Sequence, residues 1–164
     1  KIISFVTGKN NELPEQLNER EKLHLMDVRN KITNSTKIFY VSAILFIFLS
    51  LSSALILKDK NRIINFAGKV FVFGGLLAIA MSLALFLLIS LNFMPTFEIF
   101  HTLLFEQGTY TFDPSRELLV NIYPEQLFMD LGLKISTLVI IGSITVILIG
   151  LFLLLKSKSK KNKN

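Results

Sequence analysis

The sequence VFVFGGLLAIAMSLALFLLISL, from Val70 to Leu91, has 22 residues and no charged side chain. At about 1.5 Å per residue, a helix of this length spans the roughly 30 Å hydrocarbon core of a bilayer. Two further uncharged runs of similar length are Ile38–Leu57 and Ile135–Leu155. Since backbone polar groups in lipid must bond within their own segment, each run predicts a transmembrane helix. We therefore expect an all-α, polytopic membrane helical bundle with three transmembrane helices.

The composition argues against an ordinary soluble domain and against several kinds of catalytic centre. Hydrophobic residues make up 51% of the chain, 18% are charged, and the mean hydropathy is +0.55. The chain has no cysteine, which rules out a disulfide, a thiolate nucleophile and a cysteine-ligated metal. It also has no HExxH pattern or comparable cluster, so we predict no metal and no cofactor. A catalytic nucleophile would have to be an oxygen or an imidazole.

Charge is distributed unevenly over the segments outside the three runs. Residues 58–69 carry four bases against one acid, or +3, and the tail 156–164 carries five lysines. Residues 92–133 carry six acids against one arginine, or −5, and residues 1–36 nearly cancel. Short basic segments stay on the cytoplasmic side, so both His-bearing segments are expected outside. Beside a membrane helix the basic tail indicates topology, and we predict no nucleic-acid partner.

This topology predicts a further helix before the first residue. Three spans with a cytoplasmic tail put Lys1 outside, yet residues 1–36 contain no signal peptide that could export it. We therefore expect a fourth, N-terminal transmembrane helix to be missing from this stretch. The predicted single membrane domain, residues 1–164, comprises an extracytoplasmic segment 1–36, span 38–57, cytoplasmic loop 58–69, span 70–91, extracytoplasmic segment 92–134, span 135–155 and cytoplasmic tail 156–164.

The first outer segment is expected to hold an extended piece and a helix. Residues 1–9 suggest a short extended stretch that turns at Gly8. A helix is predicted from Pro14 to about Lys31, because proline suits a first helical turn and glutamates favour the N-terminal half. Residues 30–34 are expected to break this helix before the membrane span.

The second outer segment is expected to hold short amphipathic helices. Apolar side chains recur at helical spacing around His101, which predicts an interfacial helix that ends at Gly108. The Asp-Pro pair at residues 113–114 is typical of an N-cap followed by proline at the first helical position. We therefore predict a short helix over residues 116–120, followed by a turn at residues 123–124 into the last span.

The chain has two histidines, His24 and His101, and the topology puts both on the same side of the membrane. Their imidazoles are its only side chains that titrate near neutral pH without help. A pair at one bilayer surface is a candidate for proton transfer on a lipid or lipid-linked substrate. Asp27 and Glu21 each lie three positions from His24 on one side of the predicted helix, where a carboxylate could orient the imidazole. For Glu21, a solvated surface charge is the alternative.

Two stretches carry a family resemblance. They are REKLHLMDVRN, Arg20–Asn30, and FEIFHTLLFEQGTYTFDPSRELLVNIYPEQLF, Phe97–Phe128. Together they resemble the lipoprotein intramolecular transacylase family of Gram-positive bacteria. The most specific parts are the His-x-x-Asp-Val pattern at residues 24–28 and the following positions of the second stretch: Phe100-His101, Phe105, Gly108, Phe112-Asp113-Pro114 and Pro124-Glu125. Tyr110 departs from the family pattern, in which Trp is common.

The resemblance implies a four-span enzyme that acts on a diacylglyceryl lipoprotein in the cell membrane. Such enzymes move the sn-2 acyl chain from the glycerol oxygen to the free α-amine of the N-terminal Cys, at the extracytoplasmic face. The family histidines map onto His24 and His101. We expect His24 to be the base, oriented by Asp27, and His101 to polarise the ester carbonyl, although these roles can be exchanged. Further substrate contacts are expected from Phe100, Phe105, Tyr110 and Glu125.

Two other classes of function stay open. The chain could be a non-enzymatic membrane protein, an assembly factor or a small permease, whose histidines are incidental. Against a permease, none of the three runs holds an ionisable residue of the kind found in transport pathways. A different acyl- or phospho-transfer enzyme acting on membrane lipid is the third class.

Overall fold

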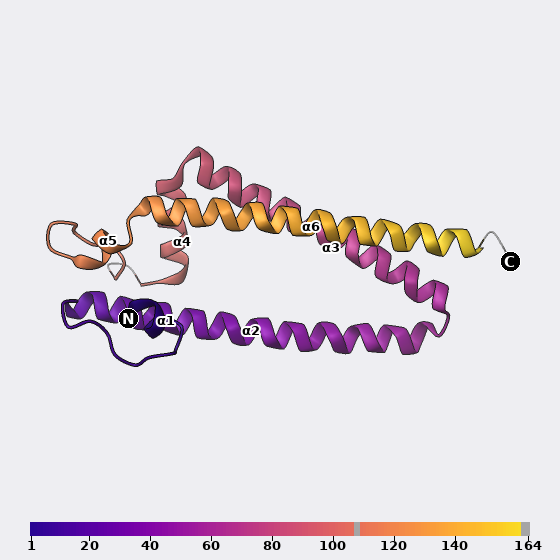
Figure 1. The fold of residues 1–164 in the computed structure, drawn as a ribbon, viewed down its shortest axis with the longest axis horizontal. Helices are drawn as coiled ribbons and strands as arrows, with labels where there is room; N and C mark the ends of the chain where they lie inside the picture. The colour runs from indigo at the N-terminus through magenta and orange to yellow at the C-terminus, as the bar shows by residue number, and fades with distance from the viewer. Residues whose placement is uncertain (107–108, 162–164) are drawn as a thin grey trace. The chain divides into compact units, whose positions relative to one another are not determined.

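The structure is a computed structural model that describes residues 1–106 and 109–161. In this part of the chain it is all-helical and has no strand. Its six helices, in chain order, are α1 (Ile2–Val6), α2 (Glu19–Leu57), α3 (Lys60–Leu91), α4 (Phe93–Leu104), α5 (Leu118–Ile122) and α6 (Glu125–Lys161) (Figure 1). The all-α prediction is therefore confirmed. Gly108, where we expected a helix to end, lies outside the described residues.

Three of the helices, α2, α3 and α6, are long and apolar enough to cross a membrane, and each contains one predicted span. No residue of the most apolar 18-residue window of α2 is buried, and only 17% and 11% of the corresponding windows of α3 and α6 are. A helix that exposes leucine, isoleucine and phenylalanine all round needs an apolar solvent. The protein is a multi-pass membrane protein.

The described chain divides into two compact units. The first comprises Lys1–Ile44 and Asn92–Asp130, and the second comprises Leu45–Leu91 and Leu131–Asn164. Both histidines belong to the first unit, which holds the predicted outer segments. The second unit holds most of the apolar helical length.

In the second unit, α3 and α6 approach each other closely at glycines. A Cβ added to Gly68 would lie 2.9 Å from the carbonyl oxygen of Gly150, and one added to Gly150 would lie 2.9 Å from that of Gly68. A Cβ on Gly75 would meet the side chain of Ile147 at 2.6 Å. Small residues permit such contact between membrane helices, where packing replaces the hydrophobic effect as the main attraction.

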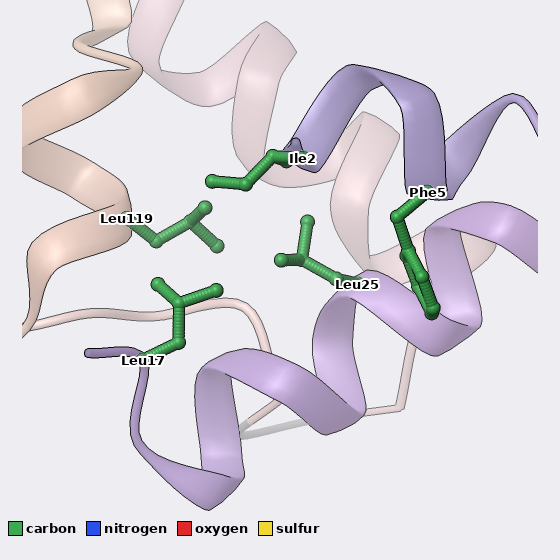
Figure 2. Close-up of a cluster of buried hydrophobic side chains, with 5 residues drawn as sticks. All are labelled: Ile2, Phe5, Leu17, Leu25 and Leu119. Carbon is green, nitrogen blue, oxygen red and sulfur yellow. The ribbon is translucent and has the colours of Figure 1, made fainter. Parts of the chain in front are cut away.

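The first unit has a small core of its own, made by α1, the loop before α2, α2 and α5. Its buried side chains are Ile2, Phe5, Leu17, Leu25 and Leu119 (Figure 2). Residues 1–9 are therefore not the extended piece we predicted. A helix places the first two of these side chains, three positions apart, on one face, where both are buried. The turn at Gly8 is confirmed by its positive φ of 75°.

Helix α2 differs from the prediction at both ends of the outer segment. It begins at Glu19 rather than Pro14, and it continues without a break through residues 30–34. Isolated Asn and Thr cost only a few tenths of a kcal/mol within a helix. No glycine or proline interrupts Glu19–Leu57, and the Thr36 hydroxyl donates a hydrogen bond to the Ile32 carbonyl at 2.8 Å. The membrane span and the His24 segment thus form one continuous helix.

The remaining connections also differ in detail. Residues 60–69, expected in a cytoplasmic loop, form the first turns of α3, whose start is capped by the Asp59 carboxylate through the Asn61 amide at 2.6 Å. The Asp113-Pro114 pair forms a turn rather than a helix start, so α5 begins two residues later than predicted, at Leu118. The predicted turn before the last span is confirmed, since α6 begins directly after Pro124.

Candidate active site

A cavity of about 340 Å³ opens in the first unit, between α2, α4, α5 and the first turn of α6. Its wall is mostly aromatic and aliphatic. The apolar lining residues are Met94, Phe97, Phe112, Leu119, Val120 and Phe128. The residues with polar groups are His24, Glu98, His101, Tyr110, Thr111, Tyr123 and Glu125. A largely apolar hollow with a few convergent polar groups is the usual form of a small-ligand site.

Both imidazoles line this one cavity. The Phe105 ring bridges them, with its centroid 4.9 Å from that of His24 and 5.6 Å from that of His101. Each histidine is 8% exposed. The structure therefore brings together two titratable side chains that are 77 positions apart in the sequence.

The His101 ring has a defined tautomer. Its Nδ1 lies 2.7 Å from the carbonyl oxygen of Phe97, one turn earlier on α4. A carbonyl oxygen can only accept, so Nδ1 carries the proton and donates it. In the neutral ring Nε2 is then left with its lone pair. The geometry makes Nε2 of His101 a proton acceptor.

The Nδ1 atom of His24, unlike that of His101, has no hydrogen-bond partner among residues 1–106 and 109–161. This atom is buried. The ring packs between aromatic side chains, 4.9 Å from Phe105 and 5.3 Å from Phe112. A lone pair is cheaper to leave unpaired in such surroundings than a polar N–H is. This favours the tautomer that carries its proton on Nε2.

Burial keeps both imidazoles neutral at physiological pH. It lowers the pKa of His24 from 6.5 to about 4; the nearby His101 lowers it further, while Asp27 opposes the shift. Burial also lowers the pKa of His101, against the hydrogen bond to Phe97, which raises it. The charged form loses its hydration in an apolar pocket, so the neutral form is favoured.

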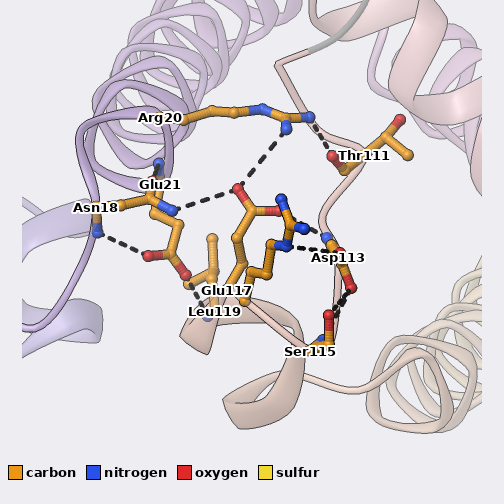
Figure 3. Close-up of polar contacts among 9 residues, drawn as sticks. Asn18, Arg20, Glu21, Thr111, Asp113, Ser115, Glu117 and Leu119 are labelled. Atoms are coloured by element: carbon orange, nitrogen blue, oxygen red, sulfur yellow. Dashed lines mark hydrogen bonds and ion pairs between the residues drawn. The ribbon is translucent and has the colours of Figure 1, made fainter.

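The predicted orienting carboxylates do not bond to His24. Asp27 raises the pKa of the ring through its charge, and among the described residues Nδ1 has no hydrogen-bond partner. Glu21 is neither an orienting group nor a solvated charge, because it is 1% exposed and its oxygens accept the amides of Asn18 at 2.8 Å and Leu119 at 2.6 Å. The Asn18 side chain in turn accepts the Glu21 amide at 2.9 Å. This is a capping box that also ties α2 to α5 (Figure 3).

Glu117 is a second buried carboxylate, and it was not among the residues predicted for the site. It is 6% exposed, accepts the Asp113 amide at 2.6 Å, and lies 3.7 Å from the Arg20 guanidinium. Arg20 also donates to the Thr111 carbonyl (Figure 3). These contacts hold the cavity-lining residues 110–112 against the start of α2. The signal that could have found Glu117 is its spacing of four from Asp113, which closes the Asp-Pro turn.

The four predicted substrate contacts fall in different places. Tyr110 and Glu125 line the cavity, and Phe105 lies against both imidazoles. Phe100 is 55% exposed and does not line the cavity, although its ring lies edge-on to His101 at 5.4 Å. Adjacent residues on a helix point about 100° apart, so a neighbour of His101 faces away from its site.

The lining also contains residues that the sequence analysis did not single out for substrate binding. They are Met94, Phe97, Glu98, Thr111, Phe112, Leu119, Val120, Tyr123 and Phe128. Phe97 could have been predicted from the sequence, because it precedes His101 by four positions and so shares its helix face. Within the described residues, no group of three or more His, Cys, Asp or Glu side chains is placed to hold a metal ion.

The chain is similar to known proteins in sequence and in fold. A family model described as lipoprotein intramolecular transacylase Lit matches residues 1–128. Among solved structures, the chain is similar to the membrane integral lipoprotein intramolecular transacylase Lit from Bacillus cereus, determined in meso, with a TM-score of 0.80 and 24% identity. That match covers 96% of this chain and 71% of the other, and at this identity it shows the fold. No curated protein sequence matches. By the family match, the chain belongs to the lipoprotein intramolecular transacylase family.

Proposed function

We propose that the protein transfers the sn-2 acyl chain of a diacylglyceryl-modified N-terminal Cys to the α-amine of the same residue. The product is an N-acylated, mono-acylglyceryl (lyso-form) lipoprotein. The observation that carries this proposal is the pair of neutral imidazoles, His24 and His101, in one mostly apolar cavity. Family membership supports the reaction class, and the reactants and residue roles are our inference.

His101 is the general base of this mechanism. Attack by an amine nitrogen on the ester carbonyl carbon forms a C–N bond and leaves a proton on nitrogen that must be removed. Nε2 of His101 has the free lone pair to accept it, because Nδ1 is engaged with Phe97. The same imidazolium then returns the proton to the glycerol oxygen as the C–O bond breaks. This exchanges the roles that we first expected for the two rings.

His24 stabilises the charge that develops on the carbonyl oxygen. With Nδ1 buried among aromatic rings and unpartnered, the neutral ring presents its proton on Nε2 as a hydrogen-bond donor. A donor in a low-dielectric site is worth more than the same donor in water, and it needs no reorganisation during the reaction. Asp27 favours any positive charge that accumulates on this ring.

The surroundings suit a substrate that carries acyl chains. Phe97, Phe112 and Phe128 supply apolar wall to the cavity, while the reacting amine and ester belong to one molecule. Holding both groups in contact makes the transfer intramolecular, where effective concentrations are large. The charge distribution of the loops supports an active site at the extracytoplasmic face.

The test is the chemical form of a lipoprotein N-terminus. We expect cells that express the full-length protein to convert a reporter lipoprotein from the diacylglyceryl form to the N-acylated, mono-acylglyceryl form, as read by mass spectrometry. His24→Gln and His101→Gln should each cut the conversion rate by about 10²–10⁴-fold. An unchanged diacylglyceryl Cys with the wild-type protein would reject the function, and near-normal conversion by both variants would reject the two-imidazole mechanism.

A further inference from the structure

An ester-to-amine transfer needs a place for the amine, which is largely an ammonium ion at neutral pH. We propose that Glu98 and Glu125 form a subsite in the cavity that binds the α-ammonium group of the substrate Cys. This inference rests on the proposed function and adds what the acceptor end of the substrate binds to. The two residues come from different helices, α4 and α6, and both line the cavity that contains the imidazoles.

The charge of the cavity wall selects for a cation. Of the residues that the structure describes, two carboxylates line the cavity and no lysine or arginine does. Because burial keeps both imidazoles neutral, nothing in the wall offsets these negative charges. An ammonium ion is attracted to such a wall, whereas a phosphate or an anionic lipid headgroup is repelled. The wall therefore fits an amine acceptor better than a phospholipid headgroup.

The two carboxylates are also available. Among the described residues, neither Glu98 nor Glu125 forms an ion pair or a side-chain hydrogen bond. The buried Glu21 and Glu117, by contrast, are occupied by backbone amides. Glu98 lies three positions before His101 on α4, so the two side chains share a helix face. A bound ammonium would thus lie on the side of the helix that carries the base.

A second, independent feature marks the cavity as a ligand site. His24 is 8% exposed, lines the same wall, and leaves a buried ring nitrogen without a partner. Buried polar groups are normally satisfied within the fold. Because Nδ1 is packed among aromatic rings, this ring can gain a partner only through Nε2, from a ligand that the cavity receives.

The substrate nitrogen loses two protons between binding and amide formation. The ammonium binds to the carboxylates, and one of its protons leaves to solvent to give the neutral amine. The amine nitrogen attacks the ester carbon, and His101 Nε2 takes the second proton and delivers it to the departing glycerol oxygen. Glu98 and Glu125 bind the substrate throughout and exchange no proton.

The test uses a synthetic diacylglyceryl-Cys lipopeptide and the full-length protein in detergent or nanodiscs. Each of the variants Glu98→Gln and Glu125→Gln loses one exposed ion pair with the substrate ammonium. We therefore expect each to raise KM about three- to fivefold. The double variant should raise KM about tenfold or more, with kcat changed less than about twofold. The wild-type KM should also rise with salt, and that rise should flatten in the double variant. Glu106→Gln is the matched control, because Glu106 is an exposed acid in the same segment that does not line the cavity.

A binding probe separates this inference from the proposed function. An ether-linked analogue, which cannot transfer its chains, should compete with the substrate better when its α-amine is free than when it is N-acetylated. The Glu variants should remove this preference. An active wild-type enzyme whose KM and amine preference are unchanged in the double variant would overturn the subsite and leave the proposed function standing. An inactive wild-type enzyme would instead refute the proposed function.

Discussion

Two buried polar side chains lie one turn apart on α2 and are treated in opposite ways. Glu21 is 1% exposed, and both carboxylate oxygens accept backbone amides, from Asn18 and from Leu119. His24 is 8% exposed, and within the described part of the chain its buried Nδ1 has no hydrogen-bond partner. The same short helix segment thus carries one group whose bonds are complete and one whose bonds are not.

This difference in hydrogen bonding distinguishes a side chain that stabilises the unit, Glu21, from one that is available to a ligand, His24. Burying a polar group without a partner costs free energy, so an unsatisfied one persists only where something else requires it. Glu21 cross-links α2 to α5, and Glu117 cross-links α2 to the turn before α5, so both fix residues that line the cavity. His24 belongs to the helix that these contacts hold in place, and it lines the cavity.

The largest effect should come from His24→Leu. We expect kcat/KM to fall about 100-fold or more, because the donor to the developing oxyanion is lost. The thermal unfolding temperature should stay the same or rise, since an unpartnered buried nitrogen is replaced by an apolar group. Parallel activity assays and unfolding curves in micelles measure both. A large drop in unfolding temperature would mean that His24 is structural, like Glu21.

Glu21→Leu should show the reverse pattern. The Asn18 and Leu119 amides would be left without their acceptor, so we expect a loss of about 1–3 kcal/mol in the stability of the first unit. Activity per folded molecule should change little. Glu19→Gln, which removes an exposed carboxylate paired with Lys22 at 2.9 Å on the same helix, is the control and should cost less than about 1 kcal/mol. Equal stability of the two variants would contradict the cross-linking role.

A smaller effect concerns pH. The pKa of His24 is lowered in the fold from 6.5 to about 4, so between these values the unfolded chain binds more protons. Stability is therefore complete above about pH 6.5 and declines as the pH falls toward about 4. Between about pH 7 and 5.5 this group should contribute a loss of about 1 kcal/mol, which His24→Leu should abolish.

The check is NMR of protein labelled at histidine, together with unfolding curves at several pH values. The His24 signal should remain that of a neutral ring down to about pH 5, well below the ordinary pKa of histidine. The spectrum of His24→Leu assigns the signals. Titration of His24 near its ordinary pKa would show that the ring is solvated in the free protein.

Local features of the sequence were enough to predict the membrane helices and the histidine pair. Uncharged runs such as Val70–Leu91 have a single stable form in lipid, and the charge asymmetry of the loops predicts that His24 and His101 lie on one side of the membrane. The burial and hydrogen bonding of Glu21 could not be predicted in this way, because one of its partners, the Leu119 amide, lies 98 positions away. Its spacing of three from His24 predicted a contact with the imidazole. Instead, the Glu21 carboxylate caps the start of α2 by accepting the Asn18 amide.

Other errors have similar physical causes. The helix continues past residues 30–34 because weak helix formers there do not outweigh the strong helix on either side. Phe100 was singled out as part of the Phe100-His101 pattern, whereas Phe97, one turn before His101, shares its helix face and lines the cavity. The contact of Glu117 with Asp113 follows from their spacing of four, but its ion pair with Arg20 joins residues 97 positions apart and could not be predicted from either segment alone.

The most direct test of the account is a double-mutant cycle on the two imidazoles. kcat/KM is measured for the wild-type enzyme, His24→Gln, His101→Gln and the double variant, with unfolding temperatures alongside. If the rings act together in one acyl-transfer step, the double variant should be no worse than about the poorer single variant. Losses that multiply in full, or a single variant with normal activity, would contradict a shared site.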